Sequence, residues 1–162
     1  MKRLVFLLLS FVAILGILNA CNKEYRQDLT PYELADYVER GLSLGALRNL
    51  DDKADFYGEL LPPENDTTFS LRVAEDGSQL DEFGVFACAD EAIAKEFAKE
   101  LEGYLEKMYQ ANREWYLSYI PEEVPKLQNA EVKSFGRYVA YAILNENERN
   151  RVFDLLREKL LR

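Results

Sequence analysis

The side chains in this sequence that could act as acids, bases or metal ligands are mostly carboxylates, because the chain contains no histidine. This excludes the Ser-His-Asp and Cys-His arrangements and every site built on imidazole ligands. The acidic residues gather at Asp51-Asp52, Asp55, Glu75-Asp76 and Asp81-Glu82. A pair of them could serve as general acid and base, or bind Ca²⁺, but the calcium-loop spacing is absent. We expect a solvated acidic surface with no metal, cofactor or catalytic residue, and hence a protein that is not an enzyme.

The two cysteines, Cys21 and Cys88, have different sequence surroundings. Cys88 is in phase with Phe86 on an expected strand and out of phase with Phe83, Val85 and Ala87. A free cysteine at such a position is typically a small buried hydrophobic residue. The alternative is a reactive thiol, which would need a basic neighbour in place of the missing histidine.

An aromatic cluster provides the best local candidate for a ligand or partner surface: Tyr109, Trp115, Tyr116 and Tyr119. On a helix, Tyr109 and Tyr116 share one face, whereas Trp115 and Tyr119 share another. Because the aromatic residues occupy two faces, we expect one face to be exposed and able to contact a sugar, a peptide or a protein. The alternative is ordinary core packing where the helix ends.

We expect the first 20 residues to form a lipoprotein signal peptide. Lys2 and Arg3 precede an apolar stretch, residues 4–18, which is too short for a membrane-spanning helix. The stretch ends in Leu18-Asn19-Ala20-Cys21, which resembles a bacterial lipobox. We therefore expect a diacylglyceryl group on Cys21 and anchoring of the protein to the lipid bilayer at the extracytoplasmic face of the cell membrane.

Length and charge limit what the remaining chain can do. Removing the signal peptide, with its two basic residues and no acidic one, would leave 142 residues with a net charge of −11. That length corresponds to one domain, residues 30–162, with its own core. The negative charge argues against binding of nucleic acid.

Hydrophobic periodicity predicts an element order of α-α-β-β-α-β-β-α. After the lipidated cysteine and a short polar tether, residues 21–29, Thr30 begins a helix as part of a capping box with Glu33. A second helix is expected at residues 52–61. Two hairpins then flank a long helix, which the spacing of Ile93, Phe97, Leu101, Leu105, Met108 and Trp115 predicts over about 91–118. Each hairpin has alternating strands, the first at 69–73 and 83–87 and the second at 132–134 and 139–143, and a last helix begins after Asn145.

These elements predict an α+β fold. The two hairpins suggest an antiparallel sheet of about four strands. Each helix has one apolar stripe, so we expect all of the helices to pack on one face of the sheet in a two-layer sandwich.

Three short stretches stand out by their order and spacing: Asp81-Glu82-Phe83-Gly84-Val85-Phe86, Tyr119-Ile120-Pro121-Glu122 and Gly136-Arg137-Tyr138-Val139. In these stretches the chain resembles an uncharacterised family of clostridial lipoproteins defined by domain of unknown function 4358. The resemblance implies a membrane-anchored protein outside the cytoplasm. It implies no activity, substrate or functional residue.

The leading functional hypothesis is a lipid-anchored accessory protein of the cell envelope that binds a partner protein and catalyses no reaction. Its basis is the expected anchor, the compact domain and the absence of a recognisable catalytic motif. The alternative is a small-molecule or glycan-binding lipoprotein that uses the region around Trp115.

Overall fold

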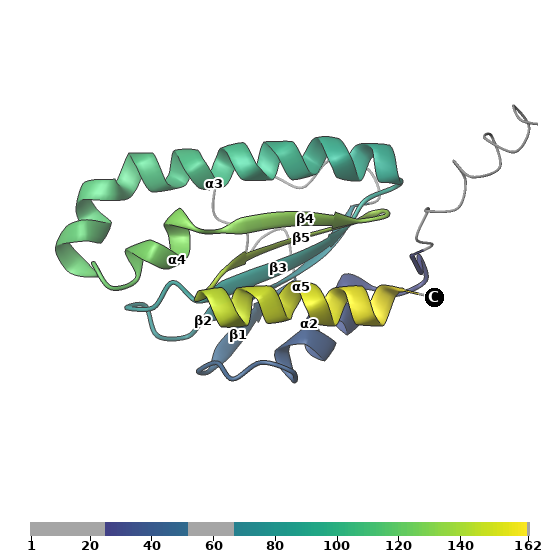
Figure 1. The fold of residues 1–162 in the computed structure, drawn as a ribbon, viewed down its shortest axis with the longest axis horizontal. Helices are drawn as coiled ribbons and strands as arrows, with labels where there is room; N and C mark the ends of the chain where they lie inside the picture. Colours follow the sequence, from purple (N-terminus) through teal and green to yellow (C-terminus); the bar gives the residue numbers. More distant parts are fainter. Residues whose placement is uncertain (1–24, 52–66, 162) are drawn as a thin grey trace, which may run out of the picture.

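A computed structural model describes residues 25–51 and 67–161, and these form one five-stranded antiparallel sheet covered by helices (Figure 1). In chain order the elements are α2 (Pro31–Glu39), β1 (Leu47–Leu50), β2 (Thr68–Ala74), β3 (Glu82–Ala87), α3 (Glu91–Tyr119), α4 (Val124–Gln128), β4 (Glu131–Phe135), β5 (Tyr138–Ile143) and α5 (Glu146–Leu160). The α+β class and both hairpins are confirmed. The helix expected at residues 52–61 lies outside the described residues.

The sheet has the strand order β1-β2-β3-β5-β4, and every neighbouring pair is antiparallel. The two expected hairpins, β2–β3 and β4–β5, join through pairing of β3 with β5. The fifth strand, β1, extends the sheet beyond β2 and is not among the expected elements. Gly136 has a φ of 60° in the tight β4–β5 turn, as its place before Arg137 in a Gly-X pair predicts.

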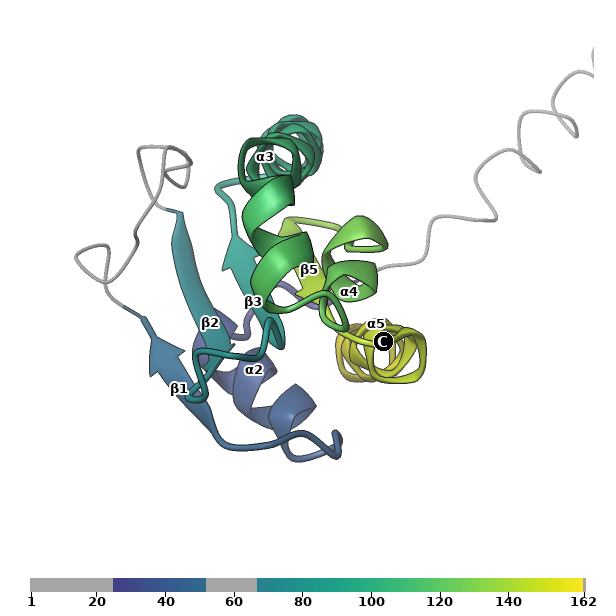
Figure 2. The same ribbon diagram turned by 90° about the vertical axis from the view of Figure 1, so that its left-hand side faces the viewer.

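The prediction that all helices pack on one face of the sheet is wrong, because helices cover both faces. Figure 2 shows α3 on one side of the strands and α2 and α5 on the other. The buried residues of α4, Val124 and Leu127, belong to the core on the α3 side. Two separate cores result, one on each face. The physical reason lies in the central strands: all six residues of β5 are buried, so this strand has apolar side chains pointing to both faces.

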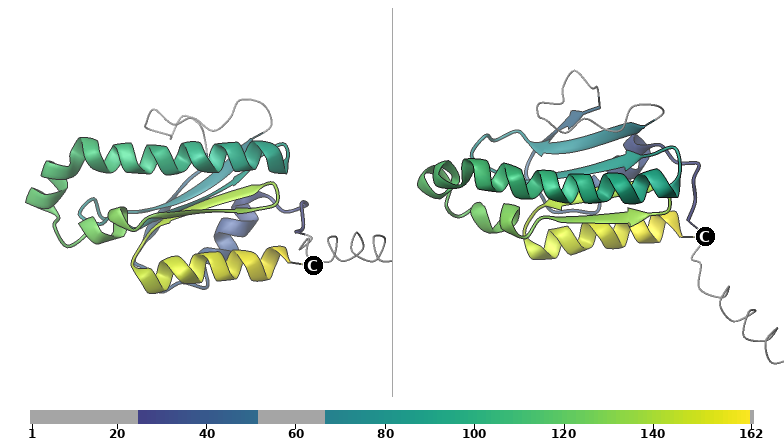
Figure 3. Two further views of the ribbon diagram at one scale, coloured as in Figure 1. Left: turned by 45° about the horizontal axis from the view of Figure 1, so that its top comes forward. Right: turned by 90° about the horizontal axis from the view of Figure 1, so that it is seen from above.

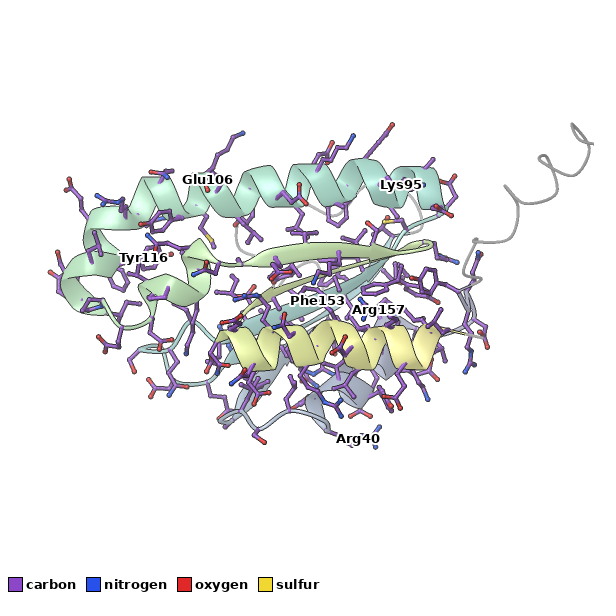
Figure 4. The ribbon with its side chains drawn as sticks, in the orientation of Figure 1. Arg40, Lys95, Glu106, Tyr116, Phe153 and Arg157 are labelled. Carbon is purple, nitrogen blue, oxygen red and sulfur yellow. The ribbon has the colours of Figure 1, made fainter. Side chains whose placement is uncertain are left out.

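The core under α2 and α5 contains Phe83, Val85 and Ala87 from β3, whereas the core under α3 contains Phe86 and Cys88. This alternation confirms the phase expected for Cys88. Burying both faces of a sheet removes more apolar area from water than a two-layer arrangement would. Each Å² of buried apolar area contributes about 25 cal/mol to the stability of the fold. In Figure 4, Phe153 of α5 lies between its helix and the sheet, in the first of these cores.

Residues 25–29, which the sequence pattern assigns to the tether, lie against the domain. Tyr25 forms a β-bridge with Leu161, and the Arg26 N–H donates to the Leu160 carbonyl over 2.8 Å. The Tyr25 ring packs edge-on against Phe135, with centroids 5.8 Å apart, and contacts the β4–β5 turn at Gly136. The described chain therefore begins at the end of the molecule where this turn lies.

The helix α3 runs away from that end of the molecule. Its first turn is close to the β4–β5 turn, because the Cys88 N–H, just before α3, donates to the Arg137 carbonyl over 3.0 Å. The 29 residues of α3 have a length of about 43 Å along the helix, and Figure 1 shows the last turns bending towards α4. Figure 3 shows the helix continuing past the ends of the strands. The last turns of α3 therefore lie at the end of the molecule opposite Tyr25.

Candidate functional site

The final turns of α3 form an exposed arm. The last buried side chain of the helix is Tyr109, and in residues 110–119 only Tyr116 is partly buried. This part of the helix is supported from below, where Ile120, Val124 and Leu127 are buried against the domain. The Gln128 side-chain amide also donates to the Tyr109 hydroxyl over 2.6 Å. These contacts hold the helix end in place while most of its surface stays free.

Trp115 and Tyr119 form the distal aromatic surface, which lies on the outer side of this arm. Trp115 is 51% exposed and Tyr119 is 70% exposed. Their ring centroids are 5.3 Å apart and the ring planes are tilted by 32°. Trp115 also contacts the Tyr116 ring edge-on, with centroids 5.5 Å apart. The result is a fixed, exposed aromatic platform.

The expected division of the four aromatic residues between two faces is confirmed. Tyr109 is 7% exposed and Tyr116 packs against the same core. Figure 4 shows Tyr116 on the inner side of the end of α3. One expectation is corrected: the periodic spacing places Trp115 in the apolar stripe of the long helix, but its side chain points to solvent. At this position the contact with the core is made by Tyr116, the next residue, so the side chain of Trp115, about 100° around the helix, faces solvent.

Glu82, which is partly buried, and Tyr141, which is buried, form a polar pair under α3. The Tyr141 hydroxyl donates to the Glu82 carboxyl group. Burial raises the pKa of Glu82, although the hydrogen bond from Tyr141 and the charge of Arg48 act in the opposite direction. Burial, together with the nearby Glu82, raises the pKa of Tyr141 well above its ordinary value, so Tyr141 remains a donor. The pair is a polar contact between β3 and β5 within an apolar core.

Glu82→Gln is expected to stabilise the protein at pH 7.5 by about 1 kcal/mol, because the amide keeps an acceptor for Tyr141 without a buried charge. The folded-state pKa of Glu82 is raised, so the native protein loses stability as pH rises above the unfolded-state pKa of this group. The advantage of the variant should therefore shrink towards pH 4. Urea unfolding of the variant and the native protein between pH 4 and pH 7.5 measures this difference in stability.

Glu106→Gln, on the outer surface of α3, is the matched control and should leave the pH dependence of unfolding unchanged. If Glu82→Gln instead lowered the stability of the protein at pH 7.5, the native structure would favour the Glu82 carboxylate, and this interpretation would be wrong.

The remaining residues considered in the sequence analysis do not join this site. Cys88 is fully buried, and burial raises the pKa of its thiol, which is the opposite of what a reactive thiolate requires. Asp51 lies 3.6 Å from the buried guanidinium of Arg72, which also pairs with Glu39 over 2.7 Å and so ties α2 to the sheet. Within residues 25–51 and 67–161 no group of three potential ligands could hold a metal ion. Cys21 lies outside the described residues.

Two polar features were missed by the sequence analysis. Glu82 was included in an acidic run, although it shares its strand face with Gly84 and Phe86 and this phase indicates an inward position. Arg149 was not singled out, yet it is 8% exposed and its Nε lies 2.8 Å from Glu131. Nothing in the local sequence around Arg149 indicates that pairing, because the two residues are brought together only by the packing of α5 against β4.

Comparisons with known proteins identify a family for this chain but no activity. A family model described as a domain of unknown function (DUF4358) matches residues 64–144, which is half of the chain. The matched region includes the distal aromatic surface and the Glu82–Tyr141 pair. No curated protein and no solved structure matches the chain. None of the helices in the described part of the chain is both long and apolar enough to cross a membrane.

Proposed function

The chain belongs to the DUF4358 family, and from that premise we propose that it is a lipid-anchored, extracytoplasmic accessory protein whose distal aromatic surface binds a partner protein. The observation that carries the proposal is the exposure of Trp115 and Tyr119 on a helix end supported from below. Tryptophan and tyrosine dominate binding energies at protein interfaces, because they present a large rigid area with a polar group at the edge.

The position of this surface supports the proposal. Only three residues separate Cys21 from Tyr25, a distance that an extended chain spans in about 14 Å. A lipid on Cys21 would therefore hold the Tyr25 end of the domain close to the bilayer. Because α3 runs in the other direction and continues past the ends of the strands (Figure 3), the distal aromatic surface would lie away from the membrane, where a partner can reach it.

A photoreactive amino acid in place of Tyr119 tests the proposal in living cells. We expect illumination to produce one recurrent cross-linked protein, and the added substitution Trp115→Ala to reduce its yield by about tenfold or more. The matched control carries the photoreactive residue at Lys95, which is exposed near the other end of α3. Equal cross-linking from both positions, or a yield that Trp115→Ala leaves unchanged, would contradict a partner at the distal aromatic surface.

A second candidate function is the binding of a glycan or another small molecule at the same residues. It is favoured by the modest tilt between the Trp115 and Tyr119 rings, since such a platform can stack against the apolar face of a sugar. Trp115 is the only tryptophan, so its fluorescence reports directly on occupancy. Saturable quenching by cell-wall oligosaccharides, without any cross-linked protein, would favour this candidate over a protein partner.

A further inference from the structure

A cavity of about 450 Å³ lies where α4 meets the first turn of α5, and it is open to solvent. Its lining includes Glu122, Lys126 and Asn129 on one side and Asn145, Glu146 and Arg149 on the other. The cavity does not contain Trp115 or Tyr119. Its volume falls in the range that takes small organic ligands, and is suited to one about the size of a short peptide.

The cationic groups of the cavity are already paired with carboxylates. The Lys126 ammonium lies 2.7 Å from Asp81 and 2.8 Å from Glu123. Burial opposes its charge, but these two carboxylates outweigh burial and raise the pKa of Lys126. The Arg149 guanidinium shares Glu131 with Lys133, over 2.8 Å in each case. A free anion would therefore find little uncompensated positive charge here.

The side-chain groups of the cavity that remain without partners favour a cationic ligand over an anionic one. The Arg149 Nη1 reaches the Leu144 carbonyl at 3.4 Å, whereas its Nη2 donates no hydrogen bond to the described residues. Glu122 and Glu146 are both exposed, and within the described part of the chain neither carboxylate forms an ion pair. The cavity thus offers one nearly buried donor and two free negative charges.

We propose that this cavity binds the amino terminus of a peptide. The ammonium group of the ligand lies between the Glu122 and Glu146 carboxylates, and the adjacent carbonyl accepts a hydrogen bond from Nη2 of Arg149. A hydrogen bond from a charged donor is stronger than one between neutral groups, and Arg149 is held in position by Glu131. The net charge of the chain, −9, also favours a cation over an anion.

Isothermal titration of the full chain in detergent tests the proposal with two probes of matched size. Alanyl-alaninamide carries an ammonium next to a carbonyl, and N-propionyl-alaninamide keeps that carbonyl but has a hydrogen in place of the ammonium. We expect saturable binding of the first probe only. The double variant Glu122→Gln/Glu146→Gln should weaken binding by about tenfold, since both exposed charges are lost without loss of shape.

Two further variants establish whether the bound probe occupies this cavity. Arg149→Lys keeps the charge beside Glu131 but removes Nη2, so it should also weaken binding, with thermal unfolding as the check on its fold. Trp115→Ala should leave binding unchanged, which distinguishes the cavity from the distal aromatic surface. The proposal would be overturned if both probes bound equally, or if neither gave a saturable heat. It would also be overturned if the double variant left the affinity for alanyl-alaninamide unchanged.

Discussion

Gly84→Ala is expected to destabilise the protein by about 3 kcal/mol, the largest stability effect that we predict for a single methyl group. Gly84 lies in the centre of β3, directly opposite Tyr141 on β5. A Cβ at this position would come within 2.3 Å of the Tyr141 ring and 2.5 Å of Leu71. Neither neighbour can move freely, because Tyr141 is hydrogen-bonded to Glu82 and Leu71 is 3% exposed in the same core.

Gly103→Ala is the matched control, because the same methyl group is added where it meets nothing. Gly103 is on the exposed side of α3, where an added Cβ would have no neighbouring atom within 4 Å. Alanine forms helix more readily than glycine, so this variant should gain about 0.5–1 kcal/mol. Urea unfolding of the two variants measures the contrast. A Gly84→Ala protein as stable as the native chain would mean that the Tyr141 ring can leave its place over β3 at little cost.

The helices and hairpins were predictable from the sequence because their signals are local. The Thr30 capping box is present, with the Thr30 side chain accepting from the Glu33 N–H and Glu33 reaching back to the Thr30 N–H. Asp90 and Asn145 likewise accept from N–H groups three residues later and begin α3 and α5. Each signal depends on residues three or four apart, a separation that does not require knowledge of the fold.

Prediction failed where an element depends on distant residues. The strand β1 is four residues long, has no alternating pattern and exists because it pairs with β2, more than twenty residues later. The placement of helices on both faces could have been recognised from Tyr138–Ile143, in which no charged side chain interrupts the apolar run. The single-face prediction relied on the apolar stripes of the helices and overlooked this second apolar face of the sheet.

The candidate site shows the same division between local and distant information. The two faces of the aromatic cluster follow from helical spacing, so the pairing of Trp115 with Tyr119 was predictable. Which face is exposed depends on where the sheet ends beneath α3, and helical spacing carries no information about that. The cavity between α4 and α5 depends on segments about twenty residues apart, and its residues have no common motif.

Cys21→Ala is expected to abolish membrane association, the largest effect on behaviour that we predict. If Cys21 carries two acyl chains, each buried methylene contributes about 0.8 kcal/mol and together the chains hold the protein stably on the bilayer. Alanine cannot carry that modification, so the variant should be found as unprocessed precursor or as released protein. Fractionation of cells, followed by mass measurement of the membrane-bound native protein, determines both the location and the diacylglyceryl group.

Cys88→Ala is the matched control, because it removes the other thiol of the chain from the core under α3. It should cost about 1 kcal/mol of stability through a small cavity and leave the protein in the membrane fraction. The comparison separates loss of an anchor from loss of a folded domain, since only Cys88 contributes to a described core. Normal cleavage and full membrane retention of Cys21→Ala would contradict the lipobox, and the orientation proposed for the distal aromatic surface would lose its basis.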